Sequence, residues 1–150
     1  MPIFRNVVEH ELAEVARLEC QIFSDPWSEK SLKDTKEQPQ GVIVVAEVEG
    51  QIAGYCILYC VVDEGEIARI AVDGNFRRQG IGCGLLDYIC TQCEEKGVER
   101  LLLDVRESNE SARQFYQQYG FDTDGIRKGF YENPKEDAIL MSKRINKLFH

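Results

Sequence analysis

Hydrophobic positions follow two different periods in the first half of the chain. Apolar residues that recur every three or four positions are typical of a helix with one buried face, whereas strict alternation is typical of a half-buried strand. The patterns predict a strand at 3–8, a helix at 11–23, a short helix between Ser28 and Pro39, and a hairpin of 42–48 and 51–62 with a turn at Glu49-Gly50. We expect Ser28 to cap the short helix. The inward face of the first helix is predicted to carry Leu12, Val15, Ala16 and Leu18.

The second half alternates strands and helices around a glycine-rich loop. A strand at 66–72 leads to the loop at 77–84, and a helix follows to about Lys96, where Gly97 ends it. A strand at 101–106 precedes a helix that we expect Ser108 to cap and Gly120 to end. Two last strands are predicted at 121–128 and 138–144. This order indicates one mixed α/β domain over 1–150, antiparallel at first and parallel around the glycine loop.

Composition and charge narrow the class of protein. The chain has 150 residues, of which 43% are hydrophobic, and a formal charge of −8. It has no apolar run of about 20 residues and no export signal, so we expect a cytoplasmic protein that crosses no membrane. An acidic chain repels phosphate backbones, which disfavours direct binding of nucleic acid. Its field attracts cations such as an amine or a basic protein tail, although many solvated surfaces are simply acidic.

Cysteine and histidine residues give no sign of a metal centre. In a reducing compartment the six cysteines are expected to be small buried hydrophobes. The two histidines, His10 and His150, lie near the ends of the sequence without the spacing of metal ligands. We therefore expect no metal cofactor.

The glycine-rich loop joins a strand to a helix. No Ser, Thr, Asp or Asn lies between Phe76 and Leu86, so no side chain is available to cap the first NH groups of that helix. Three glycines allow a ligand to approach the backbone, and two arginines add positive charge. The loop therefore predicts a seat for a phosphorylated ligand, and the alternative is a turn whose NH groups face water. The residues concerned are Arg77, Arg78, Gln79, Gly80, Ile81, Gly82, Cys83 and Gly84.

Two common phosphate loops fit this segment poorly. A mononucleotide P-loop ends in Gly-Lys-Ser or Gly-Lys-Thr, whereas this loop has Gly-Cys-Gly. The dinucleotide fingerprint requires a third glycine where this chain has Leu85, and it begins almost directly after its strand. The mononucleotide P-loop is excluded, and the dinucleotide-binding loop is a weak alternative.

A family resemblance rests on the loop and on four further segments. The pattern Arg77-x-x-Gly80-x-Gly82 after residues 70–72, with Asn109 and residues 116–121, resembles the acyl-CoA loop and the next helix of the GNAT superfamily of N-acetyltransferases. Segments 26–30, 104–109 and 136–141 are similar to the RimI-type family of ribosomal-protein-alanine N-acetyltransferases. The resemblance implies a mostly antiparallel, twisted sheet of about seven strands with about four flanking helices, and a splayed parallel pair at the acyl-CoA site.

The same resemblance implies where acetyl-CoA, the expected cosubstrate, would bind. The loop residues 77–84 would hold its diphosphate. The main chain of Ile70, Ala71 and Val72 would pair with the pantetheine amides and supply an oxyanion donor. Asn109 would hydrogen-bond the pantetheine arm, or it would merely help to start its helix.

Direct transfer of acetyl to an amine needs a base, and the sequence nominates Asp104. It interrupts an apolar run at 101–105 of the kind that is buried on both faces of a parallel sheet. A carboxylate there must be paired, with Arg69 or Arg106, or must reach a water beside the amine, where burial would raise its pKa. The matching residue in the RimI-type family is usually Glu, so the shorter Asp favours a water relay. Glu66 on the neighbouring strand is the rival base.

Aromatic residues complete the predicted site. The resemblance makes the hydroxyl of Tyr116 the acid that protonates the CoA thiolate, and the alternative is a core aromatic on the apolar stripe of its helix. Trp27, Arg69 and Tyr131 are assigned to acceptor binding, with Phe130 beside them, although each aromatic could be an ordinary packing residue. A covalent acyl-enzyme would have to use one of the two terminal histidines, which makes it the weaker route.

The acceptor is expected to be a protein N-terminus. An α-amino group has a pKa near 7.7 to 8.0 and a lysine near 10.4, so a weak base suits the former better. The resemblance implies the N-terminal alanine of a small-subunit ribosomal protein, in a bacterial cytoplasm. The alternatives are a lysine or small-molecule amine, or a non-catalytic acyl-CoA-binding module. We expect a monomer or a weak dimer.

Overall fold

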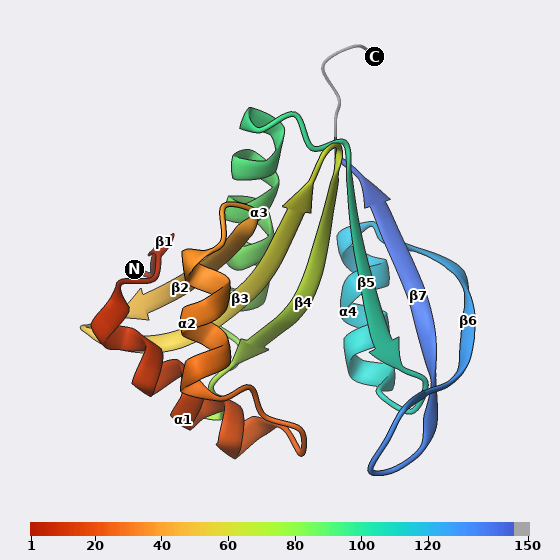
Figure 1. Cartoon of the computed structure of the whole chain (residues 1–150), viewed down its shortest axis with the longest axis horizontal. Helices are drawn as coiled ribbons and strands as arrows, with labels where there is room; N and C mark the ends of the chain where they lie inside the picture. Colours follow the sequence, from red (N-terminus) through yellow and green to blue (C-terminus); the bar gives the residue numbers. More distant parts are fainter. Residues whose placement is uncertain (146–150) are drawn as a thin grey trace.

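A single seven-stranded sheet with helices on both faces organises residues 1–145, the part of the chain that the computed structural model describes (Figure 1). The strands are β1 (Ile3–Asn6), β2 (Gly41–Val48), β3 (Gln51–Val61), β4 (Glu64–Val72), β5 (Arg100–Arg106), β6 (Asp122–Tyr131) and β7 (Glu136–Arg144). The helices are α1 (Leu12–Ile22), α2 (Glu29–Glu37), α3 (Ile81–Glu95) and α4 (Glu110–Tyr119). Two short 3₁₀ turns lie at Glu9–Glu11 and Gly74–Phe76.

The sheet order is β1-β2-β3-β4-β5-β7-β6, and every neighbouring pair is antiparallel except β4 and β5. The predicted mixed α/β fold, antiparallel first and parallel around the glycine loop, is confirmed. The parallel pair arises because α3 carries the chain from the end of β4 back to the start of β5, as a crossover helix does.

The parallel strands β4 and β5 separate after four paired positions. Pairing runs from Glu64 with Arg100 to Ile67 with Leu103, and beyond that point the strands diverge (Figure 1). On its other side β4 pairs Ile67 with Leu58 and Arg69 with Ile57 of β3, which leaves Ala68 as an extra residue. Such a bulge bends its strand and increases the local twist. The bulge therefore lies where β4 turns away from β5.

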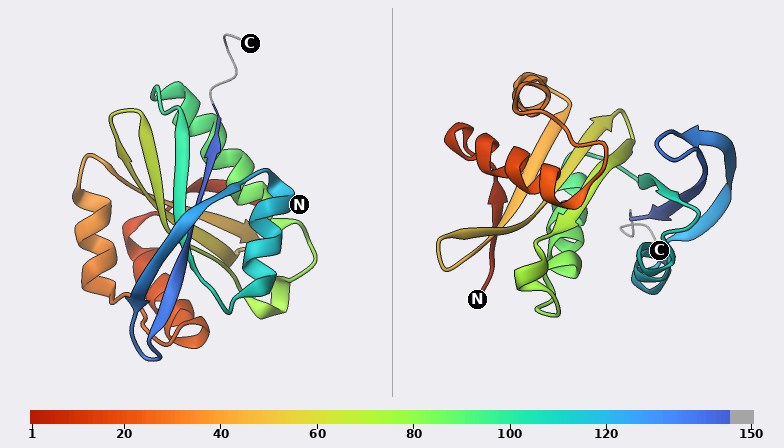
Figure 2. Two further views of the ribbon diagram at one scale, coloured as in Figure 1. Left: turned by 90° about the vertical axis from the view of Figure 1, so that its right-hand side faces the viewer. Right: turned by 90° about the horizontal axis from the view of Figure 1, so that it is seen from below.

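Helices cover the two faces of the sheet in separate groups (Figure 2). The helices α1 and α2 pack on one face of β2 and β3, where Leu12, Leu18 and Leu32 join an apolar cluster with Ile43 and Ile57. The helix α3 covers the opposite face of the same strands, and α4 lies on that side against the second half of the sheet. The split between β4 and β5 is thus flanked by different helices on its two faces.

One predicted helix cap is confirmed by the structure, and another is wrong. The hydroxyl of Ser28 accepts a hydrogen bond from the amide of Ser31 at 3.1 Å, as predicted for the cap of α2. The predicted cap Ser108 of α4 is wrong, because Asn109 occupies that position and its Oδ1 accepts from the amide of Ala112 at 3.2 Å. The amide of Ser108 instead donates to Glu136 at 2.6 Å.

Several other expectations need correction. The strand β1 ends two residues early, β6 continues to Tyr131, and the helix α3 already begins at Ile81 inside the predicted loop. Ala16 is only half-buried, whereas Leu12, Val15 and Leu18 are buried. The run in β5 is buried on one face only, because α1 and α2 pack on β2 and β3 rather than on β5: Leu101, Leu103 and Val105 are buried on the α3 and α4 side, and Asp104 is exposed.

The cysteines divide into three environments rather than one. Cys56 and Cys93 are buried as predicted, and all six are free thiols. Cys60 and Cys90 are half-buried, while Cys20 and Cys83 are exposed. The expectation of buried hydrophobes is therefore wrong for Cys20, on the outer side of α1, and for Cys83, in the first turn of α3.

The helices of residues 1–145 include none that is long and apolar enough to cross a membrane.

Candidate active site

Eight of the predicted site residues meet in one cleft of about 590 Å³. They are Trp27, Glu66, Arg69, Ile70, Asp104, Asn109, Tyr116 and Tyr131. The cleft runs through the split in the sheet, because its lining includes side chains from the α1–α2 side, such as Trp27, and from α4, such as Tyr116. Two molecules that approach from opposite faces of the sheet can therefore meet between β4 and β5.

Asp104 lies at the apex of this split. It is the first residue of β5 beyond the last pair with β4, and its partner on the other side is Leu140 of β7. The expected salt bridges to Arg69 or Arg106 are absent among residues 1–145, since these arginines pair with other carboxylates. Desolvation in the cleft raises the pKa of Asp104 above its ordinary value, and Arg127 lowers it by a smaller amount. An unpaired carboxylate with a raised pKa suits a general base.

Glu66, the rival base, lies in the closed part of the split. It pairs with Leu102 of β5, two residues before Asp104. Side chains at paired and alternate positions share one face of a sheet, so Glu66 and Asp104 point to the same side. Glu66 is exposed and also lines the cleft. Both carboxylates are therefore candidates by position, and Asp104 is the one that lies beyond the last pair between β4 and β5.

Tyr116 approaches the split from the opposite face. It is 7% exposed and packs edge-to-face with Phe115 and Phe121. Burial is the largest cause that raises the pKa of its phenol, and the hydroxyl makes no hydrogen bond that contributes to the shift. The phenol therefore stays protonated at neutral pH. Tyr116 is thus a core aromatic that also lines the cleft, and its role as the acid stays a prediction.

The first turn of α3 has no cap. Gly80 precedes the helix with φ +75°, and no side chain within residues 1–145 accepts a hydrogen bond as a cap of this helix. The first amide that donates within the helix is that of Gly84, to the carbonyl of Gly80 at 2.9 Å. The amides from Gly80 to Cys83 therefore lack helical acceptors, as at any helix start. Arg77, Arg78 and Gln79 are exposed beside them, so the predicted anion seat is geometrically possible.

The three glycines of the loop serve different purposes, which corrects their common interpretation. Gly80 is needed for its positive φ, which side chains rarely adopt. A Cβ at Gly82 would lie 3.0 Å from Phe115, and one at Gly84 would lie 2.1 Å from Phe4. The last two are thus small to let protein aromatics pack against α3. Because its amide is also used, Gly84 is a poor candidate for a diphosphate contact.

The predicted cofactor residues Ile70, Ala71 and Val72 form the end of β4, and Ile70 also lines the cleft. Ala71 is buried, and Ile70 and Val72 are half-buried. Their pairing with β3 occupies one edge of β4, while β5 has already diverged from the other. That free edge can accept an extended molecule as an added strand.

Comparison with known proteins identifies this arrangement. Residues 12–121 match the model of the Acetyltransferase (GNAT) family. The chain belongs to this family. It is accordingly an N-acetyltransferase, and its mixed sheet with the split pair β4–β5 is the fold of that family.

Two curated relatives of this acetyltransferase have the same described activity. It is 33% identical to the ribosomal protein bS18-alanine N-acetyltransferase of Escherichia coli strain K12, over 91% of this chain and 93% of the relative. It is 34% identical to the enzyme of that name from Haemophilus influenzae, over 95% and 98%. The crystal structure of the Escherichia coli enzyme aligns with TM-score 0.88 at 30% identity, over 100% of this chain and 99% of that one.

A solved relative contains the expected cosubstrate. An acetyltransferase from Bacillus anthracis in complex with acetyl coenzyme A aligns with TM-score 0.69 at 25% identity, over 76% of this chain and 68% of that chain.

Glu19 is a buried carboxylate beside the cleft that was not predicted from the sequence. It lies on α1 with 0% exposure, and its carboxylate accepts hydrogen bonds from the guanidinium of Arg69 at 2.9 to 3.2 Å. The signal was present, because Glu19 follows Val15 by four positions and so falls on the apolar stripe of its helix. Arg69, predicted to bind the acceptor, lines the cleft, and its Nε and Nη2 donate to protein atoms.

A second arginine of the acetyltransferase holds the opposite side of the cleft. Arg106 of β5 donates to the carbonyls of Glu132 and Pro134, both at 2.9 Å, and to the carboxylate of Glu136 at 3.2 Å. Its guanidinium lies over the ring of Tyr131 at 4.4 Å. These contacts hold the β6–β7 loop beside the end of β6, where Phe130 and Tyr131 line the cleft.

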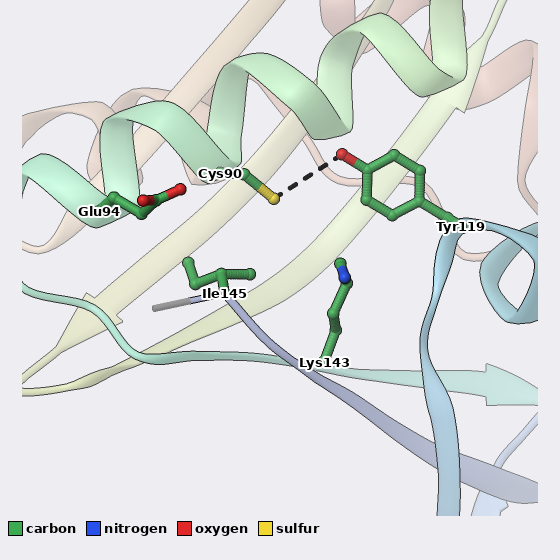
Figure 3. Close-up of a pocket in the computed structure, with 5 residues that line it drawn as sticks. All are labelled: Cys90, Glu94, Tyr119, Lys143 and Ile145. Atoms are coloured by element: carbon green, nitrogen blue, oxygen red, sulfur yellow. Dashed lines mark hydrogen bonds between the residues drawn. The ribbon is translucent and has the colours of Figure 1, made fainter. Parts of the chain in front are cut away.

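A smaller cavity of about 300 Å³ lies elsewhere, between α3, α4 and β7 (Figure 3). Cys90 Sγ lies 3.8 Å from the hydroxyl of Tyr119, and the amino group of Lys143 points toward the same space. Glu94 and Ile145 complete the lining. Because it shares no lining residue with the cleft, this cavity is separate from the cleft.

Across the described range 1–145, no group of three or more His, Cys, Asp or Glu side chains is arranged to hold a metal ion. His150 lies outside that range.

Proposed function

We propose that this acetyltransferase transfers the acetyl group of acetyl-CoA to the N-terminal alanine of ribosomal protein bS18. One observation carries the proposal: a single cleft through the split sheet joins an unpaired carboxylate, Asp104, to a buried phenol, Tyr116. The relatives named as bS18-alanine N-acetyltransferases match over nearly the whole chain and support this choice of acceptor.

Acetyl-CoA would enter on the face of the sheet that α3 and α4 cover. The uncapped first turn of α3, with Arg77 and Arg78 beside it, would hold the diphosphate. The free edge of β4 from Ile70 to Val72 would pair with the pantetheine amides. These residues would place the thioester, an activated acyl donor, in the split between the strands. The main-chain amides of the same stretch would stabilise the charge on its oxygen.

Asp104 would act from the opposite face as the base. It would accept a proton from the incoming amine, directly or through one water, as the amine nitrogen forms its bond to the acetyl carbon. Its raised pKa makes it a stronger base than an ordinary aspartate. Tyr116 would then donate its phenolic proton to the departing thiolate and recover a proton from solvent. The desolvation that raises the pKa of Tyr116 would also raise the pKa of the departing CoA thiol, so the thiolate would remain able to accept this proton.

The acceptor would approach between the two sides of the cleft, which the contacts of Arg69 and Arg106 hold in place. Trp27 stands on the α1–α2 side, and Tyr131 with Phe130 stands on the β6–β7 side. An α-amino group near pKa 8 needs about 3.4 kcal/mol less for deprotonation than a lysine at neutral pH. A single aspartate base therefore favours an N-terminus. We further propose a cytoplasmic enzyme, monomeric or weakly dimeric, that does not contact nucleic acid directly.

A product assay tests the proposal. The acceptors are a peptide with the N-terminal sequence of bS18, the same peptide blocked at its N-terminus, and a polyamine, each incubated with acetyl-CoA and analysed by mass spectrometry. We expect acetylation of the free α-amine only. Preferred modification of the blocked peptide or the polyamine would overturn the assignment. Tight binding of acetyl-CoA without turnover of any amine would instead indicate a non-catalytic module.

A further inference from the structure

The carboxylate of Glu19 connects three segments around the acceptor side of the cleft. It accepts hydrogen bonds from the hydroxyl of Tyr55 on β3 at 2.5 Å and from the amide of Trp27 at 2.8 Å, in addition to those from Arg69 on β4. A fully buried carboxylate is costly unless it is paired and hydrogen-bonded. Here both oxygens have donors, so the charge is compensated and the three segments are held together.

Arg69 extends the same contacts into the loop between α1 and α2. Its Nη2 donates to the carbonyl of Asp25 at 2.7 Å, and its guanidinium lies 3.7 Å from the centroid of the Phe23 ring. Through these contacts and the hydrogen bond from the amide of Trp27 to Glu19, every second residue of the segment 23–27 contacts the Glu19–Arg69 ion pair. This segment lines the cleft.

The segment 23–27 is remote from the predicted diphosphate-binding site at the first turn of α3. It belongs to the α1–α2 side of the sheet, whereas the first turn of α3 lies on the opposite side (Figure 2). The carboxylate of Glu19 and the Nε and Nη2 of Arg69 already bond to protein groups, so the pair can act on the acceptor side without touching a reacting atom. A change in the pair should therefore alter the acceptor side while leaving the binding of acetyl-CoA intact.

We propose that Glu19 and Arg69 are positioning residues that fix segment 23–27 as the wall against which the first residue of the acceptor fits. The inference rests on the proposed function, since the acceptor is taken to be a protein N-terminus. It adds a specificity element: the buried pair sets the acceptor KM and the preference for a small first residue.

Steady-state kinetics of Arg69→Gln and Glu19→Gln test the role. Loss of one partner frees the segment, and ordering it again on binding raises the KM for an alanine-first peptide about tenfold. The KM for acetyl-CoA should change less than twofold, and the preference for an alanine-first over a leucine-first peptide should fall. Arg17→Ala is the matched control, because Arg17 forms an exposed ion pair with Glu14 on the same helix and should change neither KM.

The double variant Glu19→Gln/Arg69→Gln separates positioning from stability. It leaves no unpaired charge, so its thermal stability should exceed that of Arg69→Gln. The acceptor KM should remain raised, because the shorter amide cannot replace the guanidinium that reaches both Glu19 and Asp25. A purely structural role predicts instead that the KM recovers with the stability.

Hydrogen exchange of the segment 23–27 provides a test that needs no substrate. The amide of Trp27 should be protected in the native protein and in Arg17→Ala, and should exchange faster in Glu19→Gln. Unchanged exchange, or a parallel rise of both KM values, would overturn the positioning role. Absence of turnover with every N-terminal peptide in the native protein would overturn the proposed function, whereas the exchange result would still decide whether the pair fastens the segment.

Discussion

Arg69 and Arg106 occupy corresponding places on the two strands that separate. Each lines the cleft, donates to a main-chain carbonyl of the nearest loop, stacks on an aromatic ring and pairs with a glutamate. The pairs differ in burial. The side chains of Glu19 and Arg69 are 0% and 13% exposed, whereas those of Glu136 and Arg106 are 15% and 21% exposed.

The difference implies that the two walls of the cleft are unequal. A buried ion pair leaves a large penalty when one partner is removed, while a more exposed pair is replaced by water at little cost. The α1–α2 wall is therefore rigidly specified, and the β6–β7 wall is the more adaptable one. The unpaired carboxylate lies on β5, the strand of the adaptable wall.

The largest expected effect is on kcat, and it shows which strand supplies the base. Asp104→Asn should lower kcat by about 10²- to 10⁴-fold, the range for a lost general base. Glu66→Gln should change kcat little, because Glu66 lies in the paired part of the split. Rates at saturating acetyl-CoA and peptide measure both. The reverse order would move the base to β4, and full activity in both variants would remove both carboxylates from the mechanism.

The next largest effect is on the free energy of unfolding, and it compares the loss of Arg69 with the loss of Arg106. Arg69→Ala should lower the free energy of unfolding by about 3–5 kcal/mol, because Glu19 is left buried and unpaired. Arg106→Ala should lower it clearly less, since water reaches Glu136. Urea unfolding followed by circular dichroism gives both values. Equal losses would show that burial does not distinguish the walls.

A pH series sharpens the assignment of Asp104. Its pKa is raised in the folded state, so the native state binds more protons than the unfolded state between the two pKa values. Stability should therefore fall as pH rises through this window, and Asp104→Asn should be slightly more stable than the native protein at neutral pH. The acid limb of kcat/KM should lie above the ordinary aspartate value near 4. An acid limb at or below that value would indicate an unshifted base.

The smallest expected effect on stability is the loss of a helix cap, measured for one helix from each side of the split. Ser28→Ala and Asn109→Ala should each cost about 1 kcal/mol, because each removes a side-chain acceptor from a helix start. Ser28→Ala should leave the KM for acetyl-CoA unchanged. A raised KM in Asn109→Ala, absent in the cap-preserving Asn109→Ser, would support the predicted contact of its amide with pantetheine.

Local features of the fold were predictable because they depend on neighbours in sequence. The Ser28 cap, the Glu49-Gly50 turn and the parallel crossover around the glycine loop follow from residue types and spacing. The cap of α4 was misassigned by one residue, because Ser108 and Asn109 are both good caps and the choice depends on Glu136, a residue from β7. Family resemblance supplied the roles of the cleft residues, and these stay predictions.

The amino-acid sequence by itself determined the order of the elements, the uncapped start of α3 and the presence of a carboxylate in an apolar strand. Only the tertiary structure decided what those features mean. Asp104 is unpaired because β4 and β5 part at that position, and Arg69 is committed to Glu19, fifty residues away in the chain. Periodicity records which side chains are buried, whereas the partner of a buried charge depends on contacts between distant segments, which no local pattern encodes.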